Sequence, residues 1–290
     1  GVSGSELAFL AAVPAQLKAG VQAMAERLRP SSSAAVLEPL CQAAVLDNQL
    51  SPTLNLNVLF AGLQLEPAEQ RRLQEASQEL LEGLEEQAKE QGLGDSFFLH
   101  LAPNLGSQDG KEQLKWASPE HCGTSDFQFM LRGAVKEAGL LVLLNQHIAR
   151  QTGDAPLGDD FNVRTAPRNA EGLLALAQEA IAPDQMPTLI GIADTITSEP
   201  RVEGTQVRWS RGGSDRGFLT LLQEIGRAFG TPNRVVLVDS SDGELDRPSL
   251  LDPELKGLSD PEDPLQLDVL VPGGPAAYVE WFNGMARNVF

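Results

Sequence analysis

The stretch LIGIADTITSEP (residues 189–200) joins an apolar run to an aspartate, Asp194, and then to small hydroxyl residues. A short apolar run that ends abruptly at a polar residue is typical of a strand buried on both faces of a sheet. A second run of this kind, RVVLVDS (residues 234–240), ends at Asp239. Helical patterns alternate with these runs, so we expect a parallel sheet with helices on both faces.

Asp194 and Asp239 both fall where a predicted strand ends. In sheets of this kind, ligands bind beyond the carboxyl ends of the strands. Asp194 there can coordinate Mg²⁺, which prefers oxygen ligands and keeps several of its waters. A single aspartate at a strand end is also common in turns and caps. Taken alone, Asp194 therefore has both a structural and a metal-binding interpretation.

A second aspartate, Asp215, follows in RGGSDRGFLTLL (residues 211–222). Gly212 and Gly213 leave the backbone free to turn, and a helix is predicted to begin near Gly217. One carboxylate on a strand end and another at a helix start could share a metal ion. The alternative is that Asp215 only stabilises the helix dipole, by about 0.3–1 kcal/mol.

A lysine, Lys136, lies in the apolar segment GAVKEAGLL. We predict one long helix over residues 125–153, with Ser125 and Gln128 placed for a capping box. A lysine in such a segment can direct its compact charge at a phosphate, although more often the ammonium reaches out to solvent. Lys115 is the second lysine considered for this role.

The N-terminal part of the chain has a different pattern. Helices are predicted over residues 4–30, divided or kinked at Pro14, and over residues 66–94. Alternation of Leu and Asn in TLNLNVLF (residues 53–60) predicts a half-buried strand, and SFFLHLAP (residues 96–103) predicts another. We therefore expect a small α/β unit with antiparallel strands over residues 1–115 and a second unit over residues 116–290.

Four polar residues could hydrogen-bond a polyhydroxylated substrate. They are Asn55 and Asn57 in SPTLNLN, Asn104 in APNLG and Arg164 in FNVRTAP. For each, the alternative is a turn or strand residue whose hydrogen bonds are satisfied within the protein. The sequence contains no HExxH, GxSxG, P-loop or compact GxGxxG pattern, so the enzyme classes that those motifs mark are disfavoured.

Composition limits the partners. The 290 residues include 22 basic and 40 acidic side chains, a net charge of −18, so the surface repels nucleic acid and anionic membranes. No apolar run reaches the about 18–20 residues that a membrane span needs. Two cysteines, Cys41 and Cys122, form no CxxC pattern and suit a reducing compartment. We therefore expect a cytoplasmic protein whose partner is a small molecule rather than nucleic acid or membrane, and we make no prediction of its oligomeric state.

Taken together, these segments resemble the glucosylglycerol-phosphate phosphatases, a family of the haloacid-dehalogenase-like superfamily. The matching runs are FLAAVP, SPTLNLN, GLGDSFFLHLAPNLG, QFMLRGAVKEAGLLVLLNQ, APLGDDFNVRTAP, GGSDRGFLTLLQE and RVVLVDSSDGELDRPS. The resemblance implies an α/β fold in which residues 116–290 are the C-terminal part of a haloacid-dehalogenase-like Rossmannoid core. It also implies that residues 1–115 are an inserted α/β cap domain that encloses the sugar.

The resemblance also implies roles for individual residues. Asp194 in GIAD and Asp215 in GGSD resemble a late Mg²⁺-binding motif of the type GD…ND, split by an insertion and with Ala193 where a glycine is usual. Lys136 resembles the lysine that holds the phosphate. The implied reaction is the Mg²⁺-dependent hydrolysis of glucosylglycerol 3-phosphate in the synthesis of a salt-protective solute.

One element of the superfamily pattern is missing from these 290 residues. No apolar run is followed by DxD, the motif whose first aspartate is the nucleophile and whose second is the general acid/base. The resemblance therefore implies a fragment that lacks the N-terminal nucleophile segment. Two alternatives stay open: a phosphatase of another glycosyl-phosphate, and a non-catalytic module of the same fold that binds sugar phosphates.

Overall fold

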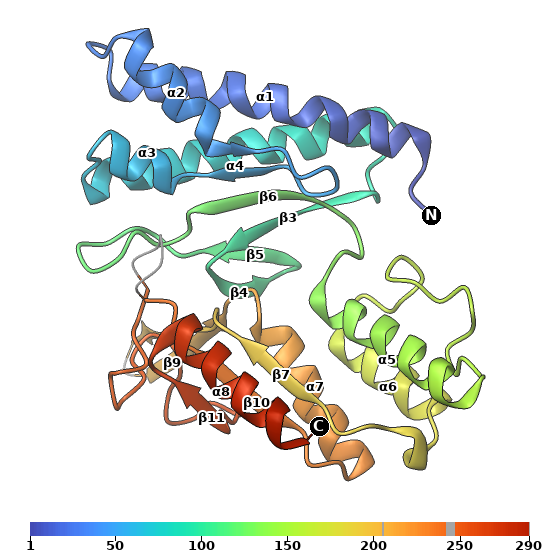
Figure 1. The fold of residues 1–290 in the computed structure, drawn as a ribbon. Coiled ribbons are helices and arrows are strands. Elements are labelled where there is room, and N and C mark those ends of the chain that lie inside the picture. Colours follow the sequence, from blue (N-terminus) through green and yellow to red (C-terminus); the bar gives the residue numbers. More distant parts are fainter. Residues whose placement is uncertain (205, 242–246, 290) are drawn as a thin grey trace. The chain divides into compact units, whose positions relative to one another are not determined.

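The computed structural model describes residues 1–204, 206–241 and 247–289. The chain divides into two compact units, an N-terminal unit (Gly1–Arg132) and a C-terminal unit (Gly133–Phe290). Each unit combines helices with a β-sheet, which confirms the mixed α/β class (Figure 1).

The N-terminal unit packs helices against one face of an antiparallel sheet (Figure 1). The sheet has the strand order β1-β2-β6-β3, and a separate hairpin is formed by β4 and β5. The helices are α1 (Gly4–Leu28), α2 (Ala34–Ala44), α3 (Asn57–Gly62) and α4 (Pro67–Glu90), and the strands are β1 (Val45–Leu46), β2 (Thr53–Asn55), β3 (Phe97–Ala102), β4 (Asn104–Gln108), β5 (Lys111–Leu114) and β6 (Asp126–Leu131).

Side chains alternate across strand β6, as a pleated strand requires. Phe127, Phe129 and Leu131 are buried in the core with the helices. Asp126 and Gln128 therefore lie on the opposite face of the sheet, which is only partly buried. We call this surface the open face of the sheet.

Helix α1 illustrates how the sequence directs the local structure. Ser3 accepts a hydrogen bond from the backbone of Glu6, and the carboxylate of Glu6 accepts one from Ser3, which forms a capping box. The helix continues through Pro14 as a single element, so of the two predicted effects of Pro14, a division and a kink, the division does not occur. By length and composition alone α1 could span a membrane, although we found no apolar run of that length in the sequence. Its side chains Leu17 and Val21 are fully buried in the core of the unit, as in a core helix.

Two elements differ from the sequence predictions. The predicted helix over residues 125–153 begins with strand β6, and only Lys136–Thr152 is helical (α5). The reason is the period-2 pattern of aromatic residues in β6, which pairs with β2 on one side and β3 on the other. These pairings also tie β6 to the N-terminal unit, so the contacts divide after Arg132 rather than after residue 115. The predicted strand over residues 53–60 becomes helical from Asn57 onward.

The C-terminal unit contains a parallel sheet with the order β11-β10-β7, as expected. Its central strand, β10, directs Val235 and Leu237 into a core with α7, and Val236 and Val238 into a core with α8. Helices thus cover both faces of this sheet. The elements are α5, α6 (Ala170–Ala180), η1 (Pro183–Gln185), β7 (Ile190–Ala193), β8 (Thr197–Glu203), β9 (Gln206–Gly212), α7 (Arg216–Phe229), β10 (Arg234–Val238), β11 (Val269–Val271) and α8 (Gly274–Val289).

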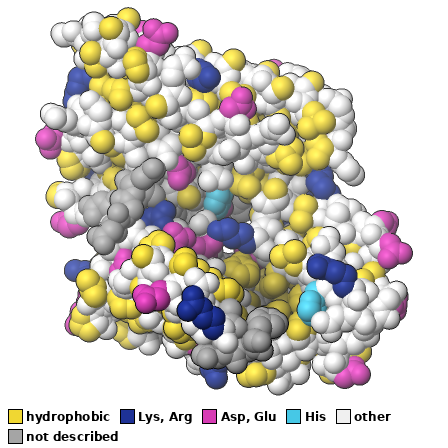
Figure 2. Space-filling view, in the orientation of Figure 1, with side chains coloured by type: hydrophobic (Ala, Val, Ile, Leu, Met, Phe, Trp, Pro, Cys, Tyr) yellow, Lys and Arg dark blue, Asp and Glu magenta, His cyan; other side chains and the backbone are white. Residues whose placement is uncertain are grey.

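Acidic side chains on the face shown in Figure 2 are scattered rather than gathered into one patch. Cationic side chains lie between them on the same face. This distribution is typical of a solvated surface, as the spread of acids along the sequence indicates.

Candidate active site at the carboxyl edge of the parallel sheet

The carboxyl ends of β7 and β10 bring their following residues together. Because the two strands are parallel and paired, Asp194 and Asp239 follow them at the same edge of the sheet. The hydroxyl of Ser240 donates a hydrogen bond of 3.1 Å to the backbone carbonyl of Asp194, which links the two strand ends directly. The candidate site is built at this edge.

Asp215 is fixed deep in this edge, with only 4% of its surface exposed. It precedes the first residue of α7 but makes no capping bond to that helix. Instead, its Oδ2 accepts hydrogen bonds from the backbone amides of Asp194 (3.2 Å) and Thr195 (2.9 Å). The carboxylate therefore holds the strand end that carries Asp194, although 21 residues separate the two aspartates in the chain.

A glycine makes this approach possible. Gly213 has a φ of +95°, and a Cβ at this position would lie 2.6 Å from the backbone of Thr195 and Ile196. Any side chain would both strain the backbone and collide with main-chain atoms. Gly213 therefore allows the segment before α7 to lie directly against the end of β7.

Lys136 meets Asp215 in an ion pair between its Nζ and Oδ1. It is the first residue of α5 rather than a residue in the middle of a long helix, and 55% of its side chain is exposed. The structure thus brings together the three residues predicted for phosphate and metal binding, Lys136, Asp194 and Asp215. The alternative lysine, Lys115, is buried in the N-terminal unit.

Asp194 points its carboxylate toward solvent, with 51% of the side chain exposed. Its Oδ2 accepts a 2.8 Å bond from Nη1 of Arg247, and its Oδ1 accepts a 3.1 Å bond from the hydroxyl of Thr195. The same Nη1 lies 2.9 Å from the hydroxyls of Thr195 and Ser240. Arg247 therefore bridges the ends of both strands.

Arg247 is the site residue that sequence reasoning missed. It lies in a segment rich in Pro and Asp, DRPSLLDPELKGLSDPEDPL (residues 246–265), and no motif marks it. Its Nε is buried and has no hydrogen-bond partner among the described residues. A cation 53 residues from its carboxylate partner can be found only from the fold.

Asp239, the other strand-end aspartate, is occupied by the protein itself. Its oxygens accept hydrogen bonds from the amides of Ser241 (2.7 Å) and Leu250 (2.7 Å) and from the hydroxyl of Ser249 (2.8 Å). Burial acts to raise the pKa of Asp239, but these bonds together outweigh it and the pKa is lowered. Asp239 therefore anchors the loop that carries Arg247.

The residues at this edge suit Mg²⁺ better than a metal that needs a complete cage of protein ligands. Among the described residues, no group of three or more His, Cys, Asp and Glu side chains could hold a metal. Mg²⁺ is usually bound by one or two carboxylates, with waters and substrate phosphate completing its shell. Asp194 and Asp215 meet that requirement. Asp215 pairs with Lys136 and Asp194 pairs with Arg247, so the net charge of these four side chains is zero.

The residues predicted to bind the sugar fall into three groups. Asn55 in β2 lies opposite Asp126 in β6, and its Oδ1 accepts the amide of Asn57. Asn57 Nδ2 and Ser125 Oγ, close in the chain to β2 and β6, are buried and have no partner among the described residues. Asn104 instead donates to Leu101 and Glu112 and holds the β4–β5 hairpin.

Arg164 lies in the C-terminal unit, beside the start of α5. A Cβ added to Gly133 would lie 2.6 Å from the carbonyl oxygen of Val163 and 3.4 Å from Cα of Arg164. The segment that carries Arg164 therefore packs against the turn three residues before Lys136. Arg164 thus belongs to the same unit as Lys136, whereas the three asparagines belong to the N-terminal unit.

The chain is similar to known proteins over almost its whole length. The sequence profile of the family described as "Glucosylglycerol-phosphate phosphatase (Salt_tol_Pase)" matches residues 1–286. A curated "Glucosylglycerol-phosphate phosphatase" from Synechocystis sp. is 43% identical over 300 residues, which cover 99% of this chain and 71% of that protein. No solved structure matches. The chain belongs to the glucosylglycerol-phosphate phosphatase family.

Proposed function

We propose that the protein is a Mg²⁺-dependent phosphatase that hydrolyses glucosylglycerol 3-phosphate to glucosylglycerol and phosphate. One observation carries the proposal: Lys136, Asp194 and Asp215 meet at the carboxyl edge of a parallel sheet. That edge is where such sheets bind ligands. The family and the name of the Synechocystis relative supply the substrate.

The architecture supports a haloacid-dehalogenase-like arrangement in this proposal. The C-terminal unit, with helices on both faces of a parallel sheet, corresponds to the C-terminal part of a Rossmannoid core. The N-terminal unit, with a helix-covered sheet and a polar open face, corresponds to the cap. In the cap, Asn55 and Asn57 beside Asp126 offer donors and acceptors to sugar hydroxyls.

Each site residue has a separate task in the proposed reaction. The ammonium of Lys136, which is half exposed, binds the phosphate oxygens as a compact charge. Asp215 orients Lys136 with one oxygen and fixes the backbone beneath Asp194 with the other. The exposed carboxylate of Asp194 and one oxygen of Asp215 would hold Mg²⁺. When bound, this ion supplies charge neutralisation of the phosphate and of the attacking carboxylate.

The nucleophile is the part of the mechanism that these 290 residues do not contain. In the proposed reaction a carboxylate attacks phosphorus in line, the glycerol oxygen of the ester leaves with a proton supplied by the general acid, and water then hydrolyses the aspartyl-phosphate. We propose that this aspartate belongs to a part of the protein outside this sequence. The relative extends beyond the aligned region, which supports the idea.

Cytoplasmic location is part of the same proposal. The net charge of −18 disfavours nucleic acid and anionic membranes as partners. Cys41 is a buried free thiol, which suits a reducing compartment.

The decisive experiment measures phosphate release from glucosylglycerol 3-phosphate with Mg²⁺. It uses this chain and a version extended through the upstream coding sequence. We expect activity only in the extended form. An extended protein that contains an intact DxD and still releases no phosphate would overturn the proposal. Sucrose 6-phosphate as a second substrate tests the specificity, because the carboxylate edge alone would treat both esters alike.

A further inference from the structure

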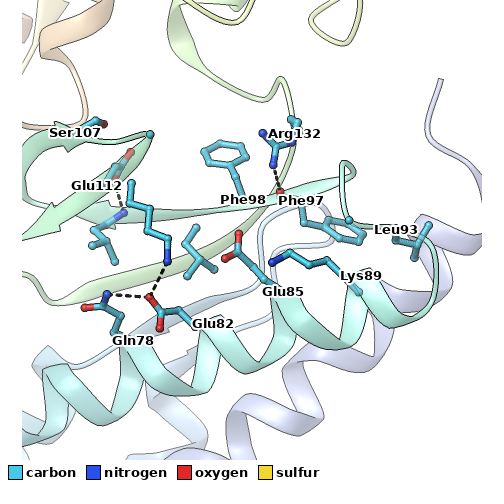
Figure 3. Close-up of a pocket in the computed structure, with 16 residues that line it drawn as sticks. Gln78, Glu82, Glu85, Lys89, Leu93, Phe97, Phe98, Ser107, Glu112 and Arg132 are labelled. Carbon is cyan, nitrogen blue, oxygen red and sulfur yellow. Dashed lines mark hydrogen bonds and ion pairs between the residues drawn. The ribbon is translucent and has the colours of Figure 1, made fainter.

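A separate cavity of about 400 Å³ lies within the N-terminal unit. It is enclosed by one side of α4, by the start of β3 and by the β4–β5 hairpin (Figure 3). Cavities that bind small ligands typically measure about 300–1,000 Å³. The proposed phosphatase site uses none of the residues that line this cavity.

The walls of the cavity combine an aromatic surface with charged groups. Phe97 and Phe98 form part of the apolar wall, and Leu93 closes one end. Figure 3 shows Glu85 and Lys89 extending from α4 toward β3, with Phe98 and Arg132 next to each other on the side of that strand away from α4. A ligand here would meet both an apolar face and polar atoms.

Two of the polar side chains have unused hydrogen-bonding capacity. Glu85 makes no hydrogen bond within the described part of the chain, and burial raises the pKa of its carboxyl group. Arg132 donates one bond of 2.9 Å to the carbonyl of Phe97, but its Nε is buried and has no partner among the described residues. Buried polar groups without partners are costly, and a ligand that bonds to them removes that cost.

The charge of the lining indicates the chemistry of the ligand. Its carboxylates are Glu82, Glu85 and Glu112, and its cations are Lys89, Lys111 and Arg132, so the sum is zero. Lys111 and Glu82 form an ion pair of 3.7 Å within the cavity. An anion such as phosphate would meet three carboxylates with no surplus of positive charge. A neutral polyhydroxylated molecule would instead donate to the carboxylates and accept from the cations.

We propose that this cavity is a binding site for a neutral sugar or glycosyl-polyol, with Glu85 and Arg132 bonding the hydroxyls and Phe98 packing on a carbon face of the ring. The site is distinct from the Asn55 end of the open face. Asn55 pairs with Asp126 of β6, and Asp126 pairs with Ala102 of β3. Phe98 lies four residues before Ala102 along β3, a separation of about 13 Å. The inference rests on binding alone and does not depend on the proposed phosphatase activity.

Isothermal titration calorimetry of the 290-residue chain tests the site. The probes are glucosylglycerol, sucrose and glucose, with inorganic phosphate as the charged comparison. We expect at least one neutral sugar to bind and phosphate not to compete with it. Glu85→Gln should weaken the sugar about tenfold, since a bond to a charged group contributes about 1.5–3 kcal/mol. Glu79→Gln, on the exposed side of the same helix, is the matched control and should not change the affinity.

Two further variants distinguish this cavity from the Asn55 end of the open face. Phe98→Ala removes the aromatic wall and should also weaken the sugar, so the test does not depend on the folding of one variant. Sugar binding that is lost in Asn55→Ala but kept in Glu85→Gln and Phe98→Ala would overturn the proposal, as would the absence of any sugar binding. The phosphate-release assay of the proposed function uses none of these variants, so its outcome is separate from each of these binding results.

Discussion

The C-terminal unit contains two sets of ion pairs that differ in exposure and in the number of hydrogen bonds within each pair. The difference distinguishes pairs that could exchange for a ligand from pairs that support the fold. At the carboxyl edge, Lys136 and Asp194 are each about half exposed, and each meets its partner with a single atom. Beside the β8–β9 hairpin, Asp260 and Asp263 are almost completely buried, and each meets an arginine with both oxygens. The partners of these buried pairs are Arg211 (2.8 and 2.7 Å) and Arg216 (2.8 and 2.8 Å).

The difference shows which cations can be exchanged for a ligand. In each pair at the edge one member, Lys136 or Asp194, is about half exposed and the contact is a single bond, so a phosphate can draw Lys136 away, or a metal ion can displace Arg247 from Asp194, at a lower cost than in a fully buried pair. A buried pair with two contacts cannot lose one member without leaving an uncompensated charge. The arginine pairs therefore hold the hairpin and the start of α7 in place, while the pairs at the edge remain available for binding.

The largest expected effect comes from breaking a buried pair. Asp260→Asn leaves Arg211 facing a neutral group and should lower the free energy of unfolding by about 3–5 kcal/mol. Urea unfolding followed by circular dichroism measures this loss. Glu262→Gln, two residues away and exposed, is the control and should change stability by less than about 0.5 kcal/mol. Equal stabilities of the two variants would show that the buried pair does not support the unit.

The second-largest effect is expected for Asp215, the carboxylate that bonds both Lys136 and the backbone at the end of β7. Asp215→Asn keeps an oxygen for the amides of residues 194 and 195 but loses the charge that orients Lys136. In the extended enzyme we expect kcat to fall about 100-fold, as for a displaced catalytic group. Steady-state kinetics with saturating Mg²⁺ checks this. An unchanged kcat would assign Asp215 a purely structural role.

Acid should weaken the buried pair of Arg211 and Asp260. The hydrogen bonds from Arg211 lower the pKa of Asp260 from 3.8 to about 2. Because the pKa is lower in the folded state, the stabilisation is complete above pH 3.8 and disappears as the pH falls toward 2. Unfolding at a series of pH values should show this loss in the wild type and a much weaker one in Asp260→Asn. Parallel curves for the two proteins would contradict the assignment.

A smaller effect is expected at the exposed edge. Asp194→Asn removes one of the two proposed carboxylate ligands and should weaken Mg²⁺ about tenfold or more, while the melting temperature changes little. Calorimetric titration of the 290-residue chain with MgCl₂ measures the affinity without requiring activity. In the extended enzyme, the Mg²⁺ concentration for half-maximal activity should rise in parallel. Unchanged values in both measurements would exclude Asp194 as a ligand.

The smallest effect tests whether Arg247 competes with the metal. Arg247→Gln removes the cation from Asp194 and should strengthen Mg²⁺ binding about two- to threefold, within the small energy of an exposed ion pair. The same titration detects this change, with Arg234→Gln as a matched control, since that arginine pairs with Asp268 away from the edge. Weaker Mg²⁺ binding in Arg247→Gln would show that the arginine supports the site rather than competes for it.

Much of the site was predictable from short-range patterns. Continuous apolar runs predict β7 and β10, and parallel pairing then places Asp194 and Asp239 at one edge. The local pattern does not predict which of these two carboxylates is exposed and which is hydrogen-bonded within the protein. Asp194 is exposed and available, whereas Asp239 is saturated by Ser241, Ser249 and Leu250, which follow it in a loop without regular structure.

The incorrect prediction of a helix over residues 125–153 shows where local sequence patterns were insufficient to predict the fold. Residues 125–153 are apolar enough for a buried helix, and only the alternation of Phe127, Phe129 and Leu131 distinguishes the strand. Pairing with β2 and β3 decides in favour of the strand, and β2 ends 71 positions before β6 begins. Arg247 was missed for the same reason, because its partner becomes close only after folding.

The β8–β9 hairpin has a consequence for how such sites are recognised in genomes. It extends the chain between Asp194 and Asp215 while the backbone of residues 194 and 195 stays bonded to the second carboxylate. A pattern written with a fixed gap between the two acids would therefore overlook this protein. A search should allow any length between the two acids but require Gly213 and Asp260, the carboxylate that pairs with Arg211. Such a search would retain the close approach of the segment before α7 to the end of β7.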